Sequence, residues 1–237
     1  MDINKAIRYV KEDERWVSKL LIGVLVSVFA FLIIPALFLQ GYVIKIVRQV
    51  MNGDWDGLPE WDDWGKFLKD GFYVTVAQLI YTLPFILLLI IGTAMTGGMA
   101  SVIENGDAAG LVASGGMMLL FCLMMLFIIA LLFLTPALLI QYAIKDDFGS
   151  LFRVGEIMAI IRNNLADILI VFAVMIVAGL AISLVSSVLA LIPCLGWIAA
   201  VIIGLAVGPY ISFVTGHLYG QIAAKILGNK AGDKLEL

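Results

Sequence analysis

Residues 168–224 read ILIVFAVMIVAGLAISLVSSVLALIPCLGWIAAVIIGLAVGPYISFVTGHLYGQIAA and contain no Asp, Glu, Lys or Arg. A helix needs about 20 apolar residues to cross roughly 30 Å of hydrocarbon, so this stretch is long enough for two spans. In its middle, Ile192-Pro193-Cys194-Leu195-Gly196 carries the Pro and Gly of a tight turn. The stretch therefore predicts a hairpin of two transmembrane helices, at residues 166–191 and 197–224.

Three further blocks lack charged residues: Leu20–Ile44, Gly71–Ile103 and Ala108–Ile144. The chain of 237 residues is 62% apolar and 14% charged, which excludes a soluble globular domain. Backbone groups in lipid must be paired within a segment, so long apolar blocks predict helices. We expect one integral membrane domain over residues 1–237, an all-α polytopic bundle whose other full spans are residues 71–96 and 116–144.

The orientation follows from Lys and Arg, which favour the cytoplasmic side. Residues 1–19 hold five of them, 45–70 four, 104–107 none, 145–167 three and 225–237 three. Both termini are therefore expected in the cytoplasm of a multi-pass cell-membrane protein. Both ends of the first block are basic, which favours a re-entrant helical hairpin over residues 20–50 that breaks near Pro35. The alternative is five transmembrane helices with the amino terminus outside.

The charged segments between the spans have distinct patterns. Apolar residues recur among basic ones in residues 1–19 and 146–164, which predicts amphipathic helices on the cytoplasmic surface. Residues 51–70 form an acidic and aromatic cytoplasmic segment, and residues 225–237 form a cytoplasmic tail. The acids of the segment from Asp54 to Asp63 suit either a divalent cation or, as we favour, helix capping and pairing with nearby basic residues.

One cytoplasmic motif occurs twice. Asp62, Asp63, Trp64 and Gly65 correspond to Asp146, Asp147, Phe148 and Gly149, and the similarity continues for six further residues. A duplication would give two related halves, as in many membrane folds. The alternative is that two interfacial helix starts converged, because Asp caps a helix and an aromatic ring anchors at the headgroups.

The segment Leu58-Pro59-Glu60-Trp61-Asp62-Asp63-Trp64-Gly65, with Asp70-Gly71 after it, resembles the DUF4013 family of uncharacterised multi-pass membrane proteins. The resemblance extends over nearly the whole chain and implies a membrane setting without an assigned activity. Pro136, Asn163-Asn164, and Pro209 followed by Tyr219 are more distantly similar to the membrane region of some glycerophosphodiester phosphodiesterases. That second resemblance implies a lipid-related setting.

Polar side chains at helical spacing mark a candidate seam. Tyr210, His217 and Gln221 share one face of the last span, and Gln78, Tyr81 and Thr82 form a similar stripe on residues 71–96. Such residues line a pocket or path, or form hydrogen bonds between helices, and we favour the second interpretation.

The last span also has a small residue at every fourth position, which predicts close helix packing or a homodimer seam. The members of this packing ridge are Gly196, Ala200, Gly204, Gly208, Ser212, Gly216, Gly220 and Ala224.

The charge-free blocks contain no carboxylate, Lys or Arg for a proton relay, and no paired catalytic groups or phosphate loop occur. We therefore expect no enzyme activity, cofactor, metal or nucleic-acid partner. The expected function is accessory, lipid-organising or scaffolding, with membrane lipids and either a second copy or another membrane protein as partners. The alternative is a passive transporter for a small neutral or amphipathic solute.

Overall fold

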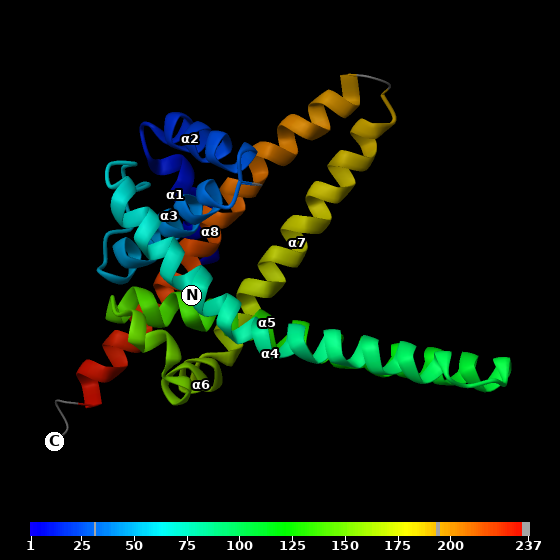
Figure 1. Ribbon diagram of the computed structural model, residues 1–237. Coiled ribbons are helices and arrows are strands. Elements are labelled where there is room, and N and C mark those ends of the chain that lie inside the picture. The colour runs from blue at the N-terminus through cyan, green and yellow to red at the C-terminus, as the bar shows by residue number, and fades with distance from the viewer. Residues whose placement is uncertain (31, 193–194, 234–237) are drawn as a thin grey trace. The chain divides into compact units, whose positions relative to one another are not determined.

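The chain forms helices throughout the part that the structure describes, which is residues 1–30, 32–192 and 195–233 of a computed structural model (Figure 1). The predicted all-α class is confirmed. The elements in chain order are α1 (Ile3–Glu12), α2 (Trp16–Val28), α3 (Ile34–Met51), α4 (Trp64–Ser101), α5 (Gly106–Lys145), the 3₁₀ helix η1 (Phe148–Phe152), α6 (Val154–Asn163), α7 (Leu165–Ala190) and α8 (Leu195–Asp233).

Four helices, α4, α5, α7 and α8, are long and apolar enough to cross a membrane. Few side chains in their most apolar windows are buried by the rest of the chain. Apolar surface of this extent is stable only in contact with hydrocarbon. The four predicted full spans of a polytopic helical bundle are therefore confirmed.

The helices extend beyond the predicted spans. The first span begins at Trp64 instead of residue 71, because the Asp63 carboxylate accepts a hydrogen bond of 2.9 Å from the backbone N–H of Lys66. The last span continues as α8 to Asp233, through most of the predicted tail. Pro193 and Cys194 of the predicted turn lie outside the described residues, as do residues 234–237 of the tail.

The chain divides into two compact units. That residues 1–237 form one integral membrane domain stays a prediction. Unit 2 is residues 76–135, the outer parts of α4 and α5, which lie side by side (Figure 1). In this hairpin Phe85 stacks on Phe127 with ring centroids 3.9 Å apart, and a Cβ on Gly92 would overlap the Leu120 side chain. Unit 2 is separate because these two helix segments pack mainly against each other.

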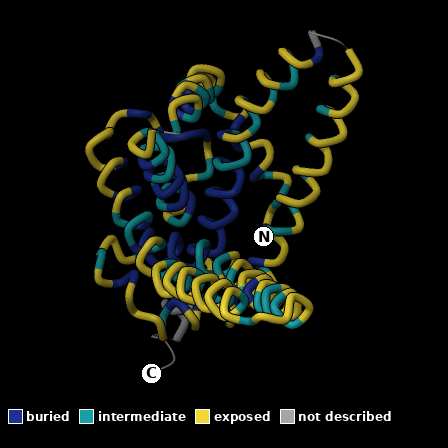
Figure 2. Tube along the Cα trace, turned by 45° about the vertical axis from the view of Figure 1, so that its right-hand side comes forward, coloured by how far each residue is buried: buried dark blue, intermediate teal, exposed yellow. Residues whose placement is uncertain are grey.

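Unit 1 comprises residues 1–75 and 136–237 and contains most of the buried side chains. Helices α1, α2, α3 and α7 all contact α8. Residues 213–223 of α8 are buried without interruption. The buried segments, dark blue in Figure 2, gather mainly among the helices of unit 1. Unit 1 is therefore organised around the carboxyl-terminal half of α8.

The amino-terminal helices are both short. The chain leaves the helical path after Val28 and resumes at Ile34, with Pro35 in the first turn of α3, where its missing N–H costs nothing. The five-span alternative requires one continuous helix over residues 20–40. The structure has two helices there instead, α2 and α3. The re-entrant placement of residues 20–50 in a membrane stays a prediction.

The surface helix predicted over residues 146–164 is divided into η1 and α6. Asp146 has a φ of 49°, a left-handed conformation that ends α5, and Arg153 is non-helical between η1 and α6. Leu151, Ile157 and Ile160 are buried and pack within unit 1, whereas Val154 and Met158 are exposed. In helix α1, Tyr9 and Val10 are likewise fully buried.

Candidate functional site

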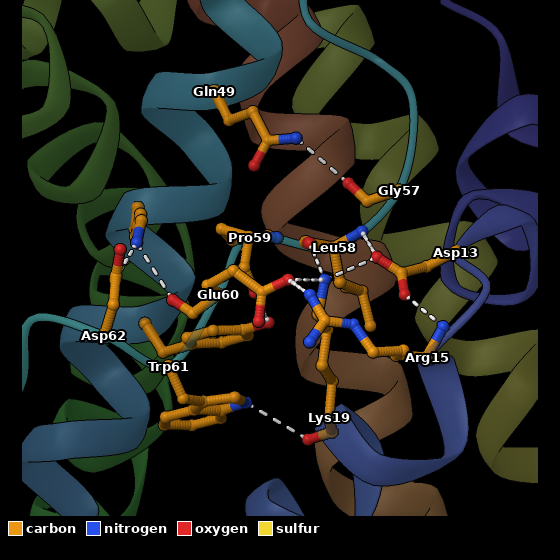
Figure 3. A network of polar contacts seen from close by, with 12 residues as sticks. Asp13, Arg15, Lys19, Gln49, Gly57, Leu58, Pro59, Glu60, Trp61 and Asp62 are labelled. Atoms are coloured by element: carbon orange, nitrogen blue, oxygen red, sulfur yellow. Dashed lines mark hydrogen bonds and ion pairs between the residues drawn. The ribbon is translucent and has the colours of Figure 1, made fainter.

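The loop between α3 and α4 carries the motif Leu58–Trp61 and is held by Lys19 of α2. The Lys19 ammonium donates to the Leu58 carbonyl at 2.6 Å and pairs with Asp13 at 2.6 Å and with Glu60 at 2.9 Å (Figure 3). The Lys19 side chain is only 7% exposed, so all three oxygens compensate for its lost hydration. The Lys19 carbonyl in turn accepts a hydrogen bond from the Trp61 indole at 3.1 Å. We call this group the Lys19 clamp.

Helix α3 holds the other side of the same loop. Tyr42 stacks on Trp61 with ring centroids 3.8 Å apart and an interplanar angle of 2°, and its hydroxyl donates to the Pro59 carbonyl at 2.7 Å. Lys45 donates to the Glu60 carbonyl at 2.9 Å and pairs with Asp62. The hydrogen bond that Lys45 donates to the Asp62 carboxylate holds the pKa of Asp62 below its ordinary value.

A charged cleft of about 730 Å³ lies beside the loop and is lined by residues of α2, α3, α4 and the loop itself. Its cations each have a carboxylate partner: Lys19 pairs with Asp13, Lys45 with Asp62, Arg48 with Asp70 and Lys66 with Asp146. Within the predicted acidic segment, Asp56 pairs with Lys5, Glu60 with Arg15 and Lys19, and Asp62 with Lys45, while Asp63 caps α4. These ion pairs cross-link the helices around the cleft.

Arg48 connects the two copies of the repeated motif. It pairs with Asp70, eight residues after Asp62, and with Asp146 at 2.8 Å. The Tyr142 hydroxyl donates to the second Asp70 oxygen at 2.7 Å. The two copies differ locally, because Asp63 caps α4 whereas Asp147 precedes the 3₁₀ helix η1 and its carbonyl accepts from Ser150. The motif therefore places two carboxylates on one guanidinium.

The stripe on α8 is covered by α1. The Tyr210 hydroxyl donates to the Ile7 carbonyl at 2.8 Å, and the Gln221 amide exchanges hydrogen bonds with the Asp2 backbone at 2.6 and 2.8 Å. His217 is fully buried, 3.1 Å from Gln221 through Nδ1, and its ring centroid is 4.5 Å from that of Tyr9. These three side chains bind α1 to α8.

The second predicted stripe lies in unit 2, which is described separately. There the Thr82 hydroxyl donates to the Gln78 carbonyl of the preceding turn at 2.7 Å, and Tyr81 is half-buried on the same helix. The packing ridge, by contrast, lies wholly in unit 1. Its members there are Gly196, Ala200, Gly204, Gly208, Ser212, Gly216, Gly220 and Ala224.

Only part of the packing ridge meets another helix. A Cβ on Gly216 would lie 3.2 Å from Val43 of α3, and one on Gly220 would lie 2.5 Å from Val50. A Cβ on Gly204 or Gly208 would meet no atom within 4 Å of the described chain. The ridge therefore packs against α3 at Gly216 and Gly220, is open at Gly204 and Gly208, and meets the Leu189 carbonyl of α7 at Gly196.

The crossing of α3 and α4 depends on two glycines that lie outside the packing ridge. A Cβ on Gly41 of α3 would overlap the Phe67 carbonyl, and one on Gly71 of α4 would overlap the Leu37 carbonyl. Each glycine thus admits the backbone of the opposite helix. Neither glycine belongs to a four-residue ridge, because no Gly, Ala or Ser lies four positions before or after it.

An open apolar groove of about 520 Å³ runs between α1, α7 and α8. Its walls include Ile7 of α1, Val174 and Ala178 of α7, and Ile211 and Val214 of α8. A polar pocket of about 840 Å³ lies toward the α1 start, with Asp2, Asp167 and Lys225 among its lining residues. Ile3 lines both cavities. Of the predicted polar stripe, Tyr210 lines the groove and Gln221 lines the pocket, whereas the residues from α1 and α7 come from distant segments that no sequence pattern connects to them.

These features define a polytopic helical membrane protein whose charged α3–α4 loop is held by α2 and α3 and whose amino-terminal helices contact α8. Residues 24–191 match the family described as "Protein of unknown function (DUF4013)", and the chain belongs to that family. An uncharacterised protein of Methanocaldococcus jannaschii, MJ1189, is 32% identical over 74 residues, which are 30% of this chain and 26% of that protein. The match thus spans about a quarter of the relative's length. No solved structure matches. These matches do not support the resemblance to glycerophosphodiester phosphodiesterases.

Proposed function

We propose that this protein is a non-catalytic cell-membrane protein that binds and organises lipid through the apolar groove between α1, α7 and α8. The groove carries the proposal. It is lined by apolar side chains of two spans, it is open, and a bilayer would supply acyl chains to fill it.

The charged cleft supports a structural role for the polar residues. Lys45, Arg48 and Lys66 each pair with a carboxylate of another element, so their charges hold the helices together. This arrangement favours a rigid scaffold that presents α1 and the groove to the bilayer. The excess of Lys and Arg at both ends of the chain supports a cytoplasmic location for the two termini.

The contacts of the α8 stripe favour lipid binding over passive transport. Tyr210 and Gln221 use their polar atoms on the α1 backbone, which leaves fewer of them to line a solute path. The groove beside them is almost wholly apolar.

The test is native mass spectrometry of the full chain purified in mild detergent from membranes of known lipid composition. We expect bound lipid in the wild type and its loss in Ala178→Trp, whose ring fills the groove. Ala181→Phe, another groove residue, should also lose lipid. Ile176→Trp is the matched control, because Ile176 is exposed on α7 outside the groove. Equal lipid binding in all four proteins would reject the proposal, and solute flux in reconstituted vesicles would favour the passive transporter.

A further inference from the structure

We infer that the lipid held in the groove is a zwitterionic phospholipid with an amine-bearing headgroup, recognised by Asp167 and Lys225. This inference rests on the proposed function, because it assigns the headgroup of the same lipid. It is carried by the polar pocket, its ion pair and its position at one end of the groove.

The groove and the pocket follow one another along the same helices. On α8 the groove uses residues up to Thr215 and the pocket begins at Gln221, a step of about 9 Å at 1.5 Å per residue. On α7 the groove begins at Ile170 and the pocket contains Asp167. The order from apolar to polar is therefore the same on both walls, as it is along a phospholipid from acyl chain to headgroup.

The pocket lies at the level expected for headgroups. Asp167 and Lys225 flank the apolar stretch from which α7 and α8 are built. Trp55 also lines the pocket, with its indole N–H donating to the Val50 carbonyl at 2.9 Å. Tryptophan is enriched at the membrane interface, where its ring lies among headgroups.

The ion pair provides a cation for the phosphate of a zwitterionic headgroup and a carboxylate for its ammonium. Lys225 Nζ lies 2.6 Å from Asp167 Oδ2, and the two side chains are 53% and 17% exposed. A phosphate that approaches Lys225 and an ammonium that approaches Asp167 would form a four-charge cluster in which every charge keeps an opposite neighbour. The Trp55 ring adds an electron-rich face for the ammonium.

The charges of the pocket disfavour an anionic headgroup. Asp2 and Asp167 line it together with Lys225 and Met1, so its two carboxylates balance the Lys225 ammonium and the terminal ammonium of Met1 and leave no surplus of positive charge. Phosphatidylglycerol carries the same phosphate charge but no ammonium, so its headgroup would bring a negative charge near these carboxylates and no cation to pair with Asp167. The preference is thus expected for the zwitterionic class over phosphatidylglycerol.

The experiment measures competition between two lipids. The full chain is reconstituted in nanodiscs that hold equal amounts of phosphatidylethanolamine and phosphatidylglycerol, and bound lipid is counted by native mass spectrometry after detergent release. We expect up to about fivefold enrichment of phosphatidylethanolamine, the most that a partly exposed charge pair supplies. Asp167→Asn should abolish the enrichment while total bound lipid remains, and Asp167→Glu should keep it.

Two further variants separate headgroup recognition from folding and from groove binding. Lys225→Met should lower the occupancy of both phospholipids, because both carry the phosphate. Lys145→Met is the matched control, since it breaks an exposed ion pair with Glu156 outside the pocket, and it should leave the enrichment unchanged. Bound lipid without headgroup preference, or a preference that persists in Asp167→Asn, would overturn this inference and leave the proposed function intact. A wild type without bound lipid would instead overturn the proposed function.

Discussion

Arg48 of α3 and Asp70 of α4 form an ion pair that is nearly removed from water, with side chains 15% and 2% exposed. Asp70 also accepts a hydrogen bond from Tyr142 of α5, and Arg48 pairs with Asp146 at the end of that helix. One guanidinium thus joins three helices. The strength of a buried pair shows most clearly when one partner is removed and the other charge remains buried.

Replacing Arg48 with Met should therefore destabilise the protein strongly. The Asp70 carboxylate would stay buried without its cation, at a cost of about 3–5 kcal/mol in the free energy of unfolding. Lys66→Met is the control, because Lys66 makes an exposed pair with Asp146 at 3.8 Å and should cost less than about 1 kcal/mol. Unfolding by a denaturing detergent, followed by circular dichroism, measures both. Similar losses in the two variants would contradict the assignment.

The glycines of the α3–α4 crossing should be far more sensitive than those of the open part of α8. Gly71→Ala places a methyl group on the Leu37 carbonyl, and the resulting separation of the helices should cost about 3 kcal/mol. Gly204→Ala enters open space and should be neutral, or stabilise α8 by up to about 1 kcal/mol through helix propensity. The same denaturation assay compares them. A large loss in Gly204→Ala would instead indicate packing against a second copy or another protein.

The sequence predicts the spans well because each depends on a local property, the absence of charge over at least 20 residues. The helix break before Pro35 is similarly local. The sites formed between segments could not be predicted in this way. Arg48 and Asp146 are 98 residues apart, and the groove needs α1 beside α7 and α8. The four-residue ridge is visible in the sequence, yet only Gly216 and Gly220 meet α3, because the neighbours of α8 change along its length.

The Lys19 clamp should weaken in acid. Burial alone would raise the pKa of Asp13, but hydrogen bonds from Lys19 and from the backbone of Arg15 and Leu58 hold the pKa below its ordinary value of 3.8. The folded state therefore binds this proton less readily than the unfolded chain. The stabilisation is complete above the ordinary pKa and is lost as the pH falls through the lower pKa of the folded state.

Asp13→Asn tests this contribution. The variant should be less stable than the wild type above about pH 5, and the difference should shrink as the pH falls below about 4. Thermal unfolding in detergent between pH 3 and 7 gives the comparison. Glu14→Gln, an exposed neighbour, should leave the pH profile of the wild type unchanged. A difference between Asp13→Asn and the wild type that is constant across this range would show that the carboxylate charge is unimportant.

Removing the hydroxyl group from either of two buried tyrosines should change the stability of the protein, but in opposite directions. Within the described residues the Tyr9 hydroxyl has no hydrogen-bond partner, whereas the Tyr42 hydroxyl donates to Pro59. Tyr9→Phe removes a buried group that has lost its water, so it should stabilise the protein by about 1 kcal/mol. Tyr42→Phe keeps the stack on Trp61 but leaves the Pro59 carbonyl without this donor, and it should cost about 1–2 kcal/mol. Both are measured by the same denaturation assay. Destabilisation by Tyr9→Phe would mean that the hydroxyl binds a partner, and the nearby buried Nε2 of His217 would then be the first group to examine.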